Sequence, residues 1–138
     1  MQVIKDFPPN YKMVISVFPA VKEMHGTVFT YGDIIYYPYM KRAIPDHLIV
    51  HEKTHSRQQG NNPAEWWDKY LADTNFRLDQ ELEAYQKQYA YYVAKNHNLK
   101  DRAWFLEAIA GDLSGAMYGN LITKLDAMEL IKNYANCK

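Results

Sequence analysis

A short run of the chain combines the residue types and the spacing of a metal site. His51 and His55 are four positions apart, and Glu52 directly follows the first histidine. Residues four apart lie on the same face of a helix, so both imidazoles could bind one zinc ion while the carboxylate between them stays unligated. The run therefore predicts a zinc site with a free carboxylate beside it.

Two histidines leave such a site short of one ligand, because a catalytic zinc ion usually has three protein ligands and a water. The single cysteine, Cys137, lies next to the C-terminus, which excludes a cysteine-based site. His25 and His97 fall in an expected loop or at an element end. His47 precedes His51 by one helical turn, and three histidines along one straight helix extend too far for one ion. The third ligand must come from another element.

Two acids on a later helix, Glu81 and Glu83, are candidates for that ligand. They are two residues apart and point to roughly opposite sides of the helix, so only one of them can face the metal. Glu81 shares its side with apolar residues, whereas Glu83 groups with polar ones. The apolar set is Leu78, Leu82 and Tyr85, and the polar set is Asp79, Gln86 and Lys87. We therefore predict Glu81 as the third ligand.

The N-terminal part of the chain is expected to form a small sheet. Residues 11–18 are rich in β-branched and aromatic types and predict a first strand. Residues 26–31 and 34–37 predict two more strands that are joined by a turn at Gly32 and Asp33. The sheet should be mostly antiparallel.

After this sheet the hydrophobic period becomes helical. A helix is expected from Pro45 to Gln59, with a proline in its first turn, Gly60 as its stop and the two histidines on its inner stripe. The further helices are expected at 63–71, 75–96, 101–117 with a break or kink at Gly111 or Gly115, and 123–134. The prediction is one α+β domain, residues 1–138, in which the sheet packs on the active-site helix and a C-terminal helical bundle.

Composition excludes several classes of function. Lysine plus arginine and aspartate plus glutamate each number 16, so the formal charge is zero and no basic stripe marks a nucleic-acid-binding protein. No apolar run at the N-terminus resembles a signal peptide, and no stretch is long and apolar enough to span a membrane. We expect a soluble, cytoplasmic protein that binds neither nucleic acid nor a membrane.

The complete set of residues resembles the metal-binding pattern of gluzincins, a branch of the zincin-type zinc metallopeptidases. The resemblance covers about residues 27–89 and is closest to the compact, single-domain members. In this family the third ligand opens a run of glutamate, two residues, alanine and an acid. Glu81 and Ala84 match that run, but Tyr85 stands where the family has its acid. The acid commonly orients a histidine ligand, so here a hydroxyl or another residue must do so.

The resemblance implies a peptidase that carries one zinc ion per chain and cleaves a peptide or protein substrate. Its metal ligands would be His51, His55 and Glu81, and Glu52 would be the general base. An oxyanion donor is also needed, with Tyr85 as the first candidate beside Tyr89, His97 and Tyr118. The hairpin edge could bind an extended peptide. Two other readings stay open: a zinc-binding structural or interaction protein of the same fold without catalysis, and a helical adaptor with coincidental histidines.

Overall fold

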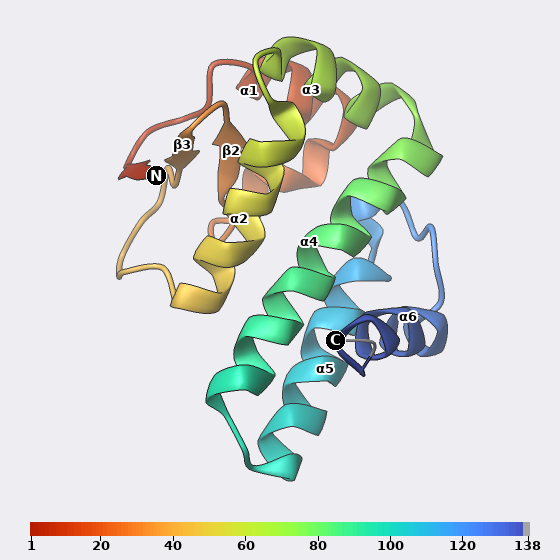
Figure 1. Ribbon diagram of the computed structural model, residues 1–138. Coiled ribbons are helices and arrows are strands. Elements are labelled where there is room, and N and C mark those ends of the chain that lie inside the picture. The colour runs from red at the N-terminus through yellow and green to blue at the C-terminus, as the bar shows by residue number, and fades with distance from the viewer. Residues whose placement is uncertain (137–138) are drawn as a thin grey trace.

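The structure is a computed structural model that describes residues 1–136, so Cys137 lies outside the described residues (Figure 1). It consists of a small sheet, α-helices and two short 3-10 helices (η). In chain order the elements are β1 (Gln2–Ile4), α1 (Tyr11–Val17), η1 (Pro19–Glu23), β2 (Phe29–Tyr31), β3 (Ile34–Tyr36), α2 (Asp46–Gln59), α3 (Pro63–Ala72), α4 (Thr74–Lys95), α5 (Leu99–Leu113), η2 (Ala116–Tyr118) and α6 (Lys124–Asn136). The predicted α+β class is confirmed.

The sheet has three strands in the order β1-β3-β2. β2 and β3 form the predicted antiparallel hairpin, in which Thr30 lies opposite Ile35. Gly32 adopts a positive φ of 63° in the turn, a conformation that favours glycine. β1 pairs with β3 in parallel and places Val3 opposite Ile35. This third strand has only three residues, too few for a hydrophobic period, and the sequence did not predict it.

Residues 11–18 do not form a strand, and the prediction of one there is wrong. The segment forms α1 instead. Its β-branched residues favour extended structure, but packing overrides such a preference. Tyr11, Val14 and Phe18 recur at helical spacing. Val14 is buried, and the other two side chains pack partly against the core, so the helix brings one apolar stripe inward.

The other predicted helices are present with small shifts at their ends. α2, α3, α4 and α6 start and end within two residues of the expected bounds. Asn62 caps α3 as expected, because its side chain accepts a hydrogen bond from the backbone N–H of Glu65 at 3.1 Å. The break expected near Gly111 or Gly115 follows Leu113, where α5 ends, and η2 comes after it.

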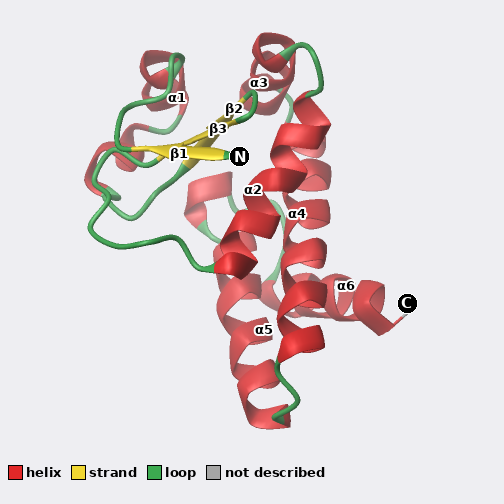
Figure 2. Ribbon diagram, turned by 60° about the vertical axis from the view of Figure 1, so that its left-hand side comes forward, coloured by secondary structure: helices red, strands yellow, loops and turns green. Residues whose placement is uncertain are grey.

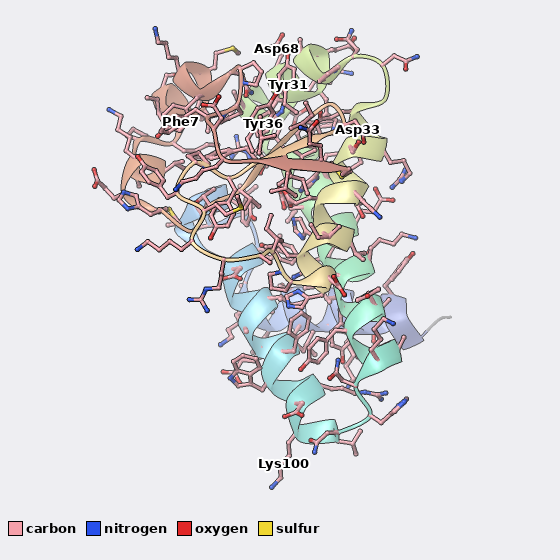
Figure 3. The ribbon with its side chains drawn as sticks, turned by 90° about the vertical axis from the view of Figure 1, so that its left-hand side faces the viewer. Phe7, Tyr31, Asp33, Tyr36, Asp68 and Lys100 are labelled. Carbon is pink, nitrogen blue, oxygen red and sulfur yellow. The ribbon has the colours of Figure 1, made fainter. Side chains whose placement is uncertain are left out.

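The helices form a bundle against which the sheet is placed. Figure 1 shows α4 running beside α2 on one side and beside α5 on the other. Figure 2 shows the sheet between α1 and α2, so α2 separates the sheet from α4. Ile35, Leu113 and Ile131 are among the fully buried side chains. In Figure 3, Tyr31 and Tyr36 mark the sheet end of the molecule, and Lys100 marks the opposite end.

Within the described residues, no helix combines the length and the apolar character that a membrane-crossing segment needs.

Candidate metal centre

The two histidines of α2 lie side by side in the interior of the protein. The side chains of His51 and His55 are buried, at 4 % and 5 % exposure. Their Nε2 atoms are 3.1 Å apart. The helical spacing of four residues therefore places both nitrogens at one point, as the sequence predicts.

Glu81 of α4 reaches the same point from the neighbouring helix. Its Oε1 lies 3.2 Å from Nε2 of His51, and its Oε2 lies 3.2 Å from Nε2 of His55. The ligand atoms of the three residues all lie within 4.8 Å of one another. Glu83 faces outward instead, where it pairs with Arg57. The structure thus brings Glu81 and not Glu83 to the histidines, and the role of the three residues as metal ligands stays a prediction.

The charges of His51, His55 and Glu81, and one carboxylate oxygen without a hydrogen bond, suit a divalent cation. Burial alone would raise the pKa of Glu81, but the two neighbouring imidazoles, His55 first, outweigh burial and lower it well below its usual range. Burial likewise opposes the charged form of His55, yet Glu81 raises the pKa of His55 to about 9. Oε1 of Glu81 is buried and accepts no hydrogen bond, an arrangement that costs free energy unless a cation binds there. Two imidazoles and one carboxylate are a donor set typical of catalytic zinc.

Two glutamines orient the imidazoles so that each Nε2 faces the candidate metal position. Nδ1 of His55 donates to Oε1 of Gln58 at 2.9 Å. The amide nitrogen of Gln58 donates to the Gln80 carbonyl and the Glu83 carboxylate, so its oxygen must be the atom that faces the histidine. Nδ1 of His51 donates to Oε1 of Gln88 at 2.9 Å. Both histidines therefore carry a proton on Nδ1, and this leaves Nε2 available for a metal.

Gln88 also explains the position of His47, which the sequence excludes as a ligand. The amide nitrogen of Gln88 donates to Nδ1 of His47 at 2.9 Å. Burial, and then the charge of His51, lower the pKa of His47 and keep it neutral. His47 thus fixes the orientation of the Gln88 amide, and through the amide it acts on His51.

A tyrosine holds the carboxylate in place. The hydroxyl of Tyr70, on α3, donates to Oε2 of Glu81 at 2.7 Å. Burial, and then the charge of Glu81, raise the pKa of Tyr70 well above its usual value, so the phenol keeps its proton. Tyr70 occupies one oxygen of Glu81 and leaves Oε1 for a metal.

Glu52 is buried next to the group without belonging to it. Its Oε2 lies 3.7 Å from Nε2 of His51, and its Oε1 accepts a hydrogen bond from the Thr30 hydroxyl at 3.1 Å. Burial raises the pKa of the Glu52 carboxyl, although both histidines act in the opposite direction. A carboxyl group with a raised pKa can both accept and donate a proton near neutral pH.

The group opens onto a cavity of about 820 Å³. Much of the cavity lining is apolar, and residues of α1, η1 and η2 contribute to it. Two of the four candidate oxyanion donors, Tyr85 and Tyr118, line this cavity, and Tyr89 and His97 do not. The two hydroxyls share a hydrogen bond of 2.9 Å. The Tyr85 ring packs edge-on against His51, with ring centroids 4.5 Å apart.

The edge of β2 is partly closed. The backbone carbonyl of Thr30 accepts hydrogen bonds from Nε2 of Gln59 at 2.8 Å and from Nε1 of Trp67 at 3.0 Å. This carbonyl is therefore not free for an added strand. Thr27 and Val28, which precede β2, line the cavity, and the Thr27 N–H donates to the Met24 carbonyl at 3.1 Å.

No protein-family model, no curated protein and no solved structure matches this chain. The resemblance to gluzincins therefore stays a prediction from the motif residues.

Four residues of the site were not predicted from the sequence: Thr30, Gln58, Tyr70 and Gln88. Spacing carries a signal for the two glutamines. Gln58 follows His55 by three positions, and Gln88 follows Glu81 by seven, so each lies on the same helix face as a candidate ligand. No local signal exists for Thr30 and Tyr70, because they reach the site from elements whose placement depends on packing.

Proposed function

We propose that this protein is a zinc-dependent peptidase. The observation that carries the proposal is the buried carboxylate of Glu52, which lies beside three candidate zinc ligands at the wall of a cavity. A zinc ion with three protein ligands keeps a position for water, whereas a structural zinc usually has four protein ligands. The group found in the described part of the chain has three. A free carboxylate and an open position favour catalysis.

In the proposed reaction zinc would activate a water molecule, and side chains of the protein would transfer the protons. A zinc ion held by His51, His55 and Glu81 would lower the pKa of bound water to about 7 and polarise the scissile carbonyl. Glu52 takes a proton from this water and later passes it to the leaving amine. The Thr30 hydroxyl binds Oε1 of Glu52 and leaves Oε2 on the histidine side for these transfers.

The Tyr85–Tyr118 pair supplies the oxyanion donor. Burial, and then the charge of Glu81, raise the pKa of both phenols well above the usual value, so both keep their protons at neutral pH. One phenol hydrogen forms the bond between the two hydroxyls. The other hydrogen remains to stabilise negative charge on the carbonyl oxygen. An extended substrate would pair with the backbone at Val28, beside the closed Thr30 carbonyl.

Replacing the proposed base tests the reaction directly. The Glu52→Gln protein should bind zinc as the wild type does and should lose cleavage of an unstructured protein such as casein. Zinc content by atomic absorption and fragment release by electrophoresis measure the two properties. Cleavage at the wild-type rate would refute Glu52 as the base. A wild-type protein that holds zinc and cleaves no unstructured protein would favour the alternative of a non-catalytic zinc protein.

A matched pair of variants tests the metal site. Glu81→Ala removes a candidate ligand, whereas Glu83→Ala removes an acid two positions away that faces Arg57 at the surface. Zinc affinity should fall strongly in the first variant and much less in the second, where Gln58 loses one partner but keeps its bond to the Gln80 carbonyl. The reverse result would exclude Glu81 as the ligand. Absence of zinc binding by the wild type would support the adaptor with coincidental histidines.

A further inference from the structure

One carboxylate on the cavity wall has no partner among residues 1–136, which the structure describes. Asp112 lies in the last turn of α5 and lines the cavity that contains the candidate metal centre. Among the described residues, none forms a hydrogen bond or an ion pair with its carboxylate. It lies close enough to the centre for its charge to contribute to the raised pKa of Tyr85, after burial and Glu81. The side chain of Asp112 is exposed where it lines the cavity. Its remaining burial raises its pKa, although the charge of His51 acts in the opposite direction.

The position of Asp112 is unfavourable for the stability of the fold. The C-terminal end of a helix carries partial negative charge, so an acid in the last turn is destabilising. The last turn of α5 contains no basic residue that would offset this charge. Helix stability therefore does not account for an aspartate at this position.

The other charges of the cavity leave Asp112 uncompensated as well. No lysine or arginine occurs among the described residues that line the cavity. A divalent ion at the centre would balance Glu52 and Glu81, and Asp112 would then supply an excess negative charge at an exposed part of the cavity wall. An exposed carboxylate attracts a cation, although solvent weakens the attraction.

We propose that Asp112 binds a cationic group of the substrate and so makes the enzyme selective for peptides with a positive charge near the scissile bond. This inference rests on the proposed peptidase function and deepens it. The cationic group is an ammonium or a guanidinium, and it comes either from a lysine or arginine side chain or from the free N-terminus of the peptide. The absence of a basic residue from the wall also disfavours substrates with a carboxylate at the same place.

The test measures binding without turnover, in the zinc-loaded Glu52→Gln protein. The probes are short peptides blocked at both ends in which lysine occupies each position in turn, and the same peptides with neutral norleucine instead. A third set has norleucine and a free N-terminus. Binding is followed by calorimetry. An ion pair with an exposed carboxylate should give the preferred cationic peptide an affinity roughly 2- to 5-fold above its neutral counterpart.

Asp112→Asn should abolish this preference and leave the binding of neutral peptides unchanged. Glu107→Gln is the matched control, because Glu107 lies on the same helix and pairs with Lys124 at the surface. The Asn variant should be at least as stable as the wild type, since it removes an unfavourable charge. If the lysine peptides bind more tightly than the neutral peptides and Asp112→Asn removes this preference, the cation is a side chain. If the peptides with a free N-terminus show this result instead, the cation is the N-terminus. Absence of any cationic preference, or its persistence in Asp112→Asn, would overturn the proposal.

Zinc content and cleavage of casein by the protein with native Glu52 are measured separately. The cationic preference can therefore be lost while zinc binding and hydrolysis remain. Conversely, absence of cleavage by the protein with native Glu52 would leave the binding result intact, so the two failures are distinguishable.

Discussion

Gln88 should be required for tight zinc binding although it does not touch the metal position. Its amide oxygen accepts the Nδ1 proton of His51 at 2.9 Å, and its amide nitrogen is held by His47 at 2.9 Å. In Gln88→Leu, His51 is free to move its proton to Nε2, where Glu81 lies 3.2 Å away and can accept it. Zinc must then displace that proton and reorient the ring before it binds.

The size of the effect follows from the lost interaction. A hydrogen bond of this kind contributes about 1 to 1.5 kcal/mol, which corresponds to roughly a tenfold change in affinity. Removal of a partner that orients a metal-bound histidine typically weakens metal binding by about 10- to 100-fold. We therefore expect a loss of at least about tenfold for Gln88→Leu. Gln88→Glu should keep or increase the affinity, because a carboxylate accepts the same proton more strongly.

The assay is competition for zinc with a chromophoric chelator, combined with circular dichroism to verify folding. Gln86→Leu is the matched control, since Gln86 lies on the same helix and contacts the Leu130 carbonyl at the surface. The control should bind zinc as the wild type does. A folded Gln88→Leu protein with wild-type affinity, or an equal loss in both leucine variants, would refute the orienting role.

Three further predictions concern the same site and its support. Tyr70→Phe removes the 2.7 Å hydrogen bond to Glu81 and should weaken zinc binding by about tenfold in the chelator assay; unchanged affinity would contradict this. The pKa of His55 is raised from 6.5 to about 9 by Glu81, so its stabilising contribution is complete below pH 6.5 and is lost as the pH rises through 9. The metal-free protein should therefore lose thermal stability over that range while its zinc affinity rises, and a flat pH profile would exclude the ion pair. Arg77→Leu leaves three backbone carbonyls, including that of Tyr118, without their donor. Chemical denaturation should show that the free energy of unfolding falls by about 3 kcal/mol or more. A fall below about 1 kcal/mol would contradict this stabilising role of Arg77.

Much of the helical framework could be predicted from local signals in the sequence. Caps, prolines and the apolar stripe placed the helix of the motif within one residue of its observed range, Asp46–Gln59. The same signals failed at Tyr11–Val17, where β-branched residues suggested a strand. There the spacing of Tyr11, Val14 and Phe18 was the better guide, because burial of a stripe outweighs residue preference.

The candidate ligands could be predicted because each depends on one helix face only. The periodicity of α4 is sufficient to place Glu81 and Glu83 on different faces of the helix. In the structure Glu81 is buried and Glu83 lies at the surface. The partners of the ligands depend on how elements meet. Tyr70 reaches Glu81 only because α3 packs on α4, and Thr30 reaches Glu52 only because β2 packs on α2. No spacing along the chain encodes such a meeting.

Tyr85 stands where the gluzincin pattern, which the motif resembles, has an acid, and Gln88 lies one turn further along α4. Gln88 follows Tyr85 by three positions, so both lie on the helix face that meets His51. The orienting bond has moved to Gln88, and the Tyr85 hydroxyl is free to pair with Tyr118 at the cavity wall. A neutral amide makes His51 a weaker donor to zinc than a carboxylate would. Under the proposed function, Gln88 should therefore leave a bound zinc ion more electrophilic at some loss of affinity, and Tyr85 is the proposed source of a phenol for the oxyanion.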